Sequence, residues 1–246
     1  MKTYRRTAVA VGILFILATA TSLLGTALIG SLSAGQLAQL AGRQDRLITA
    51  ALLELAAGIS VLLIPALLFP VLKRYNEGLA LGYFGLRLFE ATTMMLSAVS
   101  VLLLVTLGRQ SVAAGTALDP SLRAAAALAL GLHDWAFPLD PVVFGLGAVL
   151  FYSLLYSARL VPRWLSVWGL VAAVVVFALG LLRMYGGGTL ALAVPIAVQE
   201  MVLAAWLIVR GFDTQAVADE GTTRSAKVTS HDLRGAPVLE STGTQP

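Results

Sequence analysis

The chain has 246 residues, of which 58% are hydrophobic and 12% are charged, and its formal net charge is +4. A soluble domain carries about 25% charged residues, so this composition excludes an ordinary water-soluble fold. The chain contains no cysteine, which excludes disulfides, thiol catalysis and cysteine-ligated metals. Its basic residues gather at loop ends, as they do beside membrane helices. They form no stripe with interleaved aromatic residues, so nucleic acid is not an expected partner.

Residues 1–212 contain several apolar runs that reach the ~20 residues needed to cross a bilayer as a helix. These runs predict an all-α, polytopic membrane protein with six transmembrane helices in the lipid bilayer. Residues 31–46, between the first two spans, are expected to form a polar outer loop. The predicted spans are residues 8–30, 47–72, 79–107, 142–157, the run from 164 to 183, and 190–209.

The stretch between the third and fourth spans is harder to assign. Asp119-Pro120 is typical of a helix cap followed by proline at the first helical position. The alanine-rich run 121–132 then gives about three turns, which is too short to span. Asp140-Pro141 repeats the cap-and-proline signal before the fourth span. The sequence therefore predicts a separate short helix that lies over, or dips into, the outer face of the bundle.

Residues 122–139 could instead be counted as a span of their own, which would make seven. With six spans, most of the lysines and arginines beside the spans lie on one side, and with seven this excess is lost. The positive-inside rule therefore favours six spans in the cell membrane, with both termini in the cytoplasm. After the last span, residues 213–246 are rich in Thr, Ser, Gly and Asp and lack aromatic residues, so they are expected to form a disordered cytoplasmic tail.

Charged residues inside the apolar runs are the main functional signal. Arg87 and Glu90 lie three residues apart, so they share one face of the third span. Ionised groups at membrane depth are costly unless they pair or point into protein, and this helix should therefore face the interior of the bundle. Glu54 and Glu200 lie among small residues that allow another helix to approach closely. The candidate ligand-binding or proton-binding residues are Glu54, Arg87, Glu90, His133, Asp134 and Glu200.

Charge balance gives a sharper expectation for this cluster. Arg87 should pair with at least one of Glu90, Glu54 and Glu200, because an unpaired charge would be costly at this depth. One cation balances one of three nearby anions. A further carboxyl group is therefore expected to be protonated at neutral pH.

Five short motifs together resemble a known family. Their order and spacing are similar to those of the bacterial multi-pass membrane family catalogued as domain of unknown function 4386, over about residues 5–212. The resemblance implies an integral membrane protein and carries over no activity. The motifs are Leu52-Leu53-Glu54-Leu55, Tyr75-Asn76-Glu77-Gly78 leading to Arg87 and Glu90, Leu132-His133-Asp134-Trp135, Leu160-Val161-Pro162-Arg163-Trp164, and Gln199-Glu200 before Trp206.

Familiar membrane-enzyme patterns do not occur in the chain. It has no GxSxG serine elbow, no HExxH zinc motif and no phosphate-binding loop. His133 is the one histidine near the membrane domain, which excludes a zinc hydrolase with several histidines and a haem held by paired histidines. Enzyme activity is therefore the weaker hypothesis, and no catalytic residue, metal ligand or cofactor is predicted.

Two function classes stay open. In the first, the protein is structural or regulatory, its Arg/Glu cluster fixes helix packing, and its tail meets a cytoplasmic partner that the sequence does not identify. In the second, it is a small proton-coupled transporter or a polar-solute-binding membrane protein. Transporters often contain internal repeats, and the basic turn before the fifth span is not followed by anything like Arg87 and Glu90. The sequence therefore favours the first class.

Overall fold

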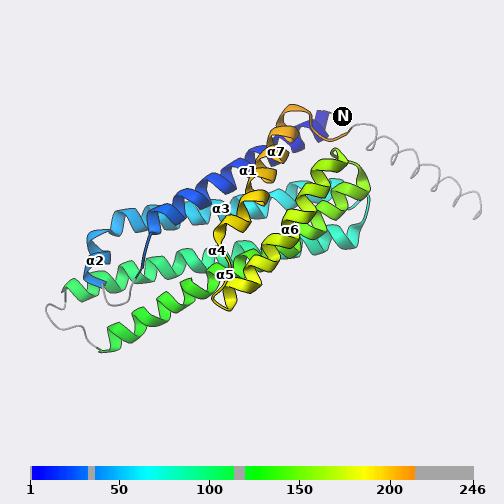
Figure 1. The fold of residues 1–246 in the computed structure, drawn as a ribbon. Helices are drawn as coiled ribbons and strands as arrows, with labels where there is room; N and C mark the ends of the chain where they lie inside the picture. The colour runs from blue at the N-terminus through cyan, green and yellow to red at the C-terminus, as the bar shows by residue number, and fades with distance from the viewer. Residues whose placement is uncertain (1, 33–36, 114–119, 214–246) are drawn as a thin grey trace, which may run out of the picture.

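The computed structural model describes residues 2–32, 37–113 and 120–213 (Figure 1). Within these ranges the chain forms helices joined by turns and contains no strand, which confirms the predicted all-α class. The predicted tail lies outside the described residues, except for Asp213. The elements are α1 (Lys2–Ile29), α2 (Leu37–Gly42), α3 (Gln44–Leu72), α4 (Glu77–Ala113), α5 (Pro120–Ala158), α6 (Arg163–Met184), the 3₁₀ turn η2 (Leu190–Ala193) and α7 (Val194–Val209).

Six of the described helices are long and apolar enough to cross a membrane, as predicted. Most of them begin and end within a few residues of the predicted spans, because the length of an apolar run is a local property of the sequence. They are Tyr4–Ile29, Gln44–Leu72, Glu77–Ala113, Pro120–Ala158, Arg163–Met184 and Leu190–Val209.

The predicted separate helix over 121–132 is wrong. Pro120–Ala158 is one continuous helix of 39 residues that contains both Pro138 and Pro141. Each proline removes only its own backbone donor, and packing of α5 between α4 and α6 keeps the rest of the helix together. Among the described residues, a short helix occurs at α2 instead, within the stretch 31–46 that was predicted as a loop.

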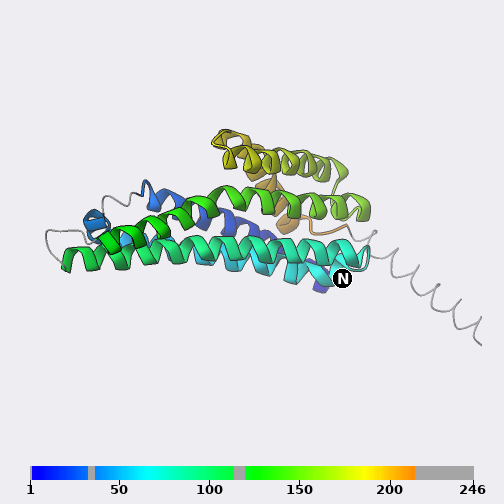
Figure 2. The ribbon, with the colours of Figure 1, turned by 90° about the horizontal axis from the view of Figure 1, so that it is seen from below.

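The six long helices follow one another around a ring. α1 packs against α3, α3 against α4, α4 against α5, α5 against α6 and α6 against α7, while α7 closes the ring on α1. Figure 2 shows three consecutive members, α4, α5 and α6, side by side across the bundle. Because neighbours in sequence are neighbours in space, the interior of the ring receives side chains from every long helix.

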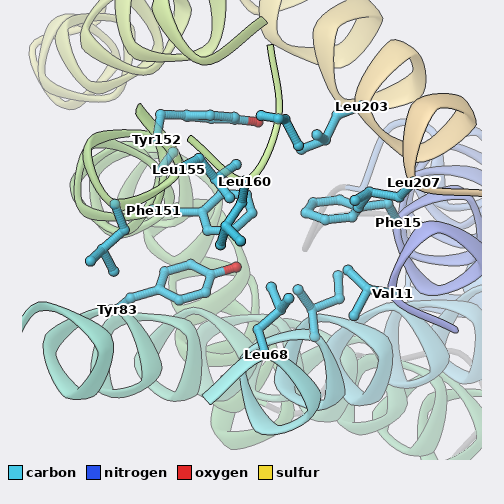
Figure 3. Packing of buried hydrophobic residues seen from close by; sticks show 14 of the residues in the cluster. Val11, Phe15, Leu68, Tyr83, Phe151, Tyr152, Leu155, Leu160, Leu203 and Leu207 are labelled. Atoms are coloured by element: carbon cyan, nitrogen blue, oxygen red, sulfur yellow. The ribbon is translucent and has the colours of Figure 1, made fainter. Parts of the chain in front are cut away.

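Large side chains fill the ring at the end where both described termini lie (Figures 1 and 3). The ring of Tyr83 stacks on Phe151 at 4.8 Å between centroids, and Phe151 also contacts Phe15 and Tyr152. All four side chains are almost completely buried. On the same side of the bundle, Gly12 lets α1 approach α7 so closely that an added Cβ would lie 2.7 Å from the carbonyl oxygen of Ala204.

Arginines from other parts of the chain cap both α1 and α7 at their carboxyl ends. Arg5 donates to the carbonyl oxygens of Leu207 at 3.2 Å and Val209 at 3.0 Å. At the opposite end of the bundle, Arg43 donates to Ile29 O at 3.0 Å and Arg46 donates to Ala27 O. The last carbonyls of a helix have no partner within it, so these contacts satisfy them and hold α1 in place at both ends.

Candidate functional site

Arg87 lies at the centre of a buried ion cluster between α4 and α7. Its Nη1 lies 3.0 Å from Oε1 and 3.1 Å from Oε2 of Glu90, one turn further along α4. Its Nη2 lies 3.6 Å from Oε1 of Glu200 on α7. The Arg87 side chain is 3% exposed. This arrangement confirms the predicted pairing of Arg87 with at least one of the three glutamates.

Two aromatic rings complete the surroundings of the guanidinium group. Its Cζ lies 5.5 Å from the centroid of the Tyr83 ring and 5.0 Å from that of the Phe144 ring on α5. A cation over an aromatic face is stabilised by the ring quadrupole, more strongly when water is excluded. Arg87 is therefore held from α4, α5 and α7 at once, and its charge is largely balanced before any ligand is considered.

Asp140 belongs to the same polar region, although sequence analysis assigned it only the role of a helix cap. Because α5 continues through Pro141, Asp140 lies inside a helix, and its Oδ1 lies 3.1 Å from Oγ1 of Thr93 on α4. The spacing of His133, Asp140 and Phe144 along α5 could have indicated this, since residues seven and eleven positions apart share a helix face.

Ser97 connects two of the predicted residues that lie on different helices. Its Oγ lies 3.0 Å from Nδ1 of His133 on α5 and 3.4 Å from Oε1 of Glu54 on α3. Glu54 is thus joined to His133 through one hydroxyl group and is not among the ion-pair partners of Arg87 in the described structure. The other oxygen of Glu54, Oε2, is buried and has no hydrogen-bond partner among the described residues.

Two adjoining cavities connect these groups. The first has a volume of about 520 Å³ and receives residues from all six long helices, including Arg87, Glu90 and Glu200. The second, of about 420 Å³, contains His133 and Asp134 in its wall. The residues that line both cavities are Thr26, Glu54, Phe137 and Arg183. His133 and Asp134 line the second cavity and not the first, and this second cavity is here called the mouth.

Acidic groups outnumber basic ones around the two cavities. No group of three histidine or acidic side chains in the described part of the chain is arranged to hold a metal ion. Arg183, which sequence analysis did not include among the candidate residues, lines both cavities, and its Cζ lies 4.8 Å from the Phe137 ring centroid. The acidic lining residues are Glu54, Glu90, Asp134, Asp140 and Glu200, and the arginines are Arg87 and Arg183.

Two hydroxyl groups in this region each face two possible hydrogen-bond partners, and a hydroxyl has one proton to give. Thr93 Oγ1 lies 2.7 Å from the carbonyl oxygen of Glu90 and 3.1 Å from Oδ1 of Asp140, and it can donate to either. If it donates to Glu90, the contact with Asp140 is a hydrogen bond only when the Asp140 carboxyl carries a proton and donates it. The same reasoning applies to Ser97. If it donates to His133, then Glu54 must be the donor to Ser97, and if it donates to Glu54, then His133 must be the donor.

The comparisons with known proteins agree with the observed architecture. The model of one family, Domain of unknown function (DUF4386), matches residues 10–211. A comparison with curated proteins gave no match, and neither did one with solved structures. The matched range includes the ion cluster, both cavities and nearly all of the six long helices. The chain belongs to the family described as Domain of unknown function (DUF4386) and has the architecture of a multi-pass membrane protein.

Proposed function

We propose that the protein binds a polar solute in its central cavity and exchanges protons through the carboxyl groups that line it, as a small proton-coupled transporter would. The observation that carries this proposal is the cavity of about 520 Å³ that residues from all six long helices line at the level of Arg87, Glu90 and Glu200. A cluster that served helix packing alone would favour a filled interface. Cavities of about 300–1,000 Å³ are typical of small-molecule sites.

The polar groups beyond the ion cluster support the same proposal. Arg87, Glu90 and Glu200 would be enough to fix the packing of α4 against α7. Asp140 and Glu54 add two further carboxyl groups from α5 and α3, at positions where an ionised group is costly unless it is paired. Intramembrane carboxyl groups in such surroundings serve as proton carriers in pumps and transporters. The regulatory alternative depends on residues 213–246, which lie almost wholly outside the described residues.

The proposed route for protons passes through Ser97. Its hydroxyl contacts both the imidazole of His133, in the mouth cavity, and the carboxyl of Glu54, which lines both cavities. A hydroxyl that accepts from one neighbour and donates to the other moves a proton between them without moving itself. Glu54 can therefore gain or lose a proton through the mouth while the ion cluster around Arg87 stays intact.

Infrared spectroscopy of the protein in lipid nanodiscs at neutral pH tests the proton-carrying groups. The expected result is a carbonyl stretching band from protonated carboxylic acids. Asp140→Asn and Glu54→Gln should each remove part of this band. Glu77→Gln serves as the control, because Glu77 is exposed at the start of α4. A band that is absent from the wild type, or that neither cavity variant changes, would show that the carboxyl groups are ionised and would refute proton exchange.

We also propose that both termini lie in the cytoplasm. The described ends of the chain lie beside two basic turns, since the guanidinium of Arg74 lies over the Tyr4 ring and the amide of Asp213 donates to Leu160 O. Basic residues beside membrane helices favour the cytoplasmic side. Alkaline phosphatase fused after Asp213 should be inactive, and green fluorescent protein at the same position should fluoresce. Active phosphatase at this position would contradict the proposed orientation.

A further inference from the structure

We propose that the solute is an organic cation with an apolar body, and that its charged group binds to Glu54. This inference depends on the proposed function, because it names the class of solute that the central cavity would take. It is argued from the charge around the cavity, from the free acceptor on Glu54 and from the composition of the wall.

The ion cluster leaves little positive charge for an anionic solute. Arg87 contacts both oxygens of Glu90 and one oxygen of Glu200, and the rings of Tyr83 and Phe144 also lie close to its guanidinium group. Its Nε has no hydrogen-bond partner among the described residues, but a carboxylate that approached it would meet the two glutamates already in place. Like charges in a low-dielectric site repel strongly. An anion is therefore a poor ligand for Arg87.

Glu54 presents the opposite situation. Its Oε1 contacts Ser97, while its Oε2 is buried without a partner within the described structure. The Glu54 side chain lines both cavities, so a small rotation of its carboxyl group would present this oxygen to a ligand. An unpaired buried acceptor costs free energy, and a cationic donor that reaches it removes this cost. A hydrogen bond between an ammonium or guanidinium group and a carboxylate is among the strong ones in proteins. Glu54 is expected to carry a proton when the cavity is empty, so binding of the cation releases this proton through Ser97 and leaves the carboxylate to accept the hydrogen bond.

The wall around Glu54 suits an apolar body. Apolar side chains reach the main cavity from several helices, and they surround the polar groups of α4 and α5. Such a lining buries the carbon skeleton of a ligand, while a few polar groups fix its orientation. The apolar side chains of the lining include Phe15, Leu23, Val61, Ile64, Phe137, Phe144, Val176 and Ile196.

Arg183 is the one basic side chain at the mouth among the described lining residues, and its positive charge repels a cation there. Asp134 lines the same mouth, and its negative charge reduces this repulsion. Deeper in the cavity, Glu54 and Asp140 have no arginine partner in the described structure, whereas Arg87 is shared by two glutamates. The favourable position for a cation is therefore below the mouth, beside Glu54.

Three probes that share a benzyl group separate the effect of charge from that of shape. They are benzylammonium, benzyl alcohol and phenylacetate, measured by calorimetry on the protein in lipid nanodiscs, with empty nanodiscs as the blank. The expected result is saturable binding of benzylammonium and none of phenylacetate. Glu54→Gln should weaken binding of the cation by roughly 10- to 100-fold, the loss expected for one charged contact. Glu77→Gln, at an exposed position outside the cavities, should leave it unchanged.

Each other outcome has a defined meaning. Binding of phenylacetate in place of the cation would overturn the inference and leave the solute-binding function standing, with Arg87 as the anchor. Equal binding of the cation to the wild type and to Glu54→Gln would also overturn it. Binding of none of the three probes overturns the inference as well. The carboxylic-acid band described above then decides separately whether proton exchange stands.

Discussion

The two halves of the helix ring are built from the same helices and differ in how they fill the interior. In the half that contains the described termini, here called the closed half, Tyr152 donates to Gln199 Oε1 at 2.5 Å and Gln199 donates to Leu165 O at 3.2 Å. All three groups have partners, and aromatic rings fill much of the remaining space, while the buried hydroxyl groups of Tyr83 and Ser166 have no hydrogen-bond partner in the described structure. In the other half, the cavity half, Ser97 is shared between two residues and Glu54 Oε2 has no partner in the described structure.

α1 illustrates how one helix produces both halves. In the closed half, Gly12 places the backbone of α1 against Ala204 of α7. In the cavity half, α1 presents short side chains to the interior, among them Thr19, Ser22 and Thr26, which line the main cavity. Contact at one end and a gap at the other need no bend in the helix. Helices that are held together at one end by close packing can leave a site at the other end.

The largest expected effect comes from the ion cluster itself. Arg87→Met should destabilise the protein by about 3–5 kcal/mol, because it leaves two buried glutamates without their cation. The double variant with Glu90→Gln should recover part of this loss, whereas the double with Glu54→Gln should equal the sum of its singles, since Glu54 does not contact Arg87 in the described structure. Denaturant-induced unfolding in detergent micelles measures the free energy of unfolding of the single and double variants. A harmless Arg87→Met would place the side chain outside the buried cluster.

Gly12→Leu tests the closed half. A side chain at this position would meet the carbonyl oxygen of Ala204 and the side chain of Ile208, both at 2.7 Å, so α1 and α7 would have to separate. The expected destabilisation is about 3 kcal/mol, at the upper end for overpacking. Gly85→Leu is the matched control, because a Cβ at Gly85 has no neighbour within 4 Å. Similar stability of the two variants would show that the contact between α1 and α7 is not tight.

The predictable part of this molecule is the part that depends on local sequence. Long apolar runs indicated the helices, and the spacing of Arg87 and Glu90 indicated their pairing, because residues three apart meet on any helix. Asp140 was missed because Asp140-Pro141 is also a good helix-start signal, and the packing of α5 overrode it. The bridge from His133 to Glu54 joins three helices, and the pattern of any one helix does not reveal which others it will contact.

Tyr152→Phe measures how much the hydrogen bonds from Tyr152 to Gln199 and from Gln199 to Leu165 O contribute to the stability of the closed half. Loss of the hydroxyl leaves Gln199 Oε1 buried without this donor, which should cost about 2 kcal/mol. Adding Gln199→Leu removes the stranded acceptor and should recover much of that loss, although it also gives up the contact with Leu165 O. Thermal unfolding of the two single variants and the double variant in detergent gives the coupling free energy between Tyr152 and Gln199. Additive effects would mean that the two side chains act independently.

Ser97→Ala should have the smallest effect on stability and the clearest effect on the proposed proton route. The cavity half can replace a lost hydroxyl with water, so we expect a change of about 0.5 kcal/mol or less. Glu54 would lose its hydrogen bond, and its carbonyl band should move to higher frequency in the infrared spectrum. Ser100→Ala is the control, because Ser100 donates to the carbonyl oxygen of Ser97 and does not contact Glu54 or His133. If Ser97→Ala destabilises the protein as much as Tyr152→Phe, the two halves are equally packed and the distinction between them fails. A band that does not move would show that Glu54 is ionised or receives its hydrogen bond from elsewhere.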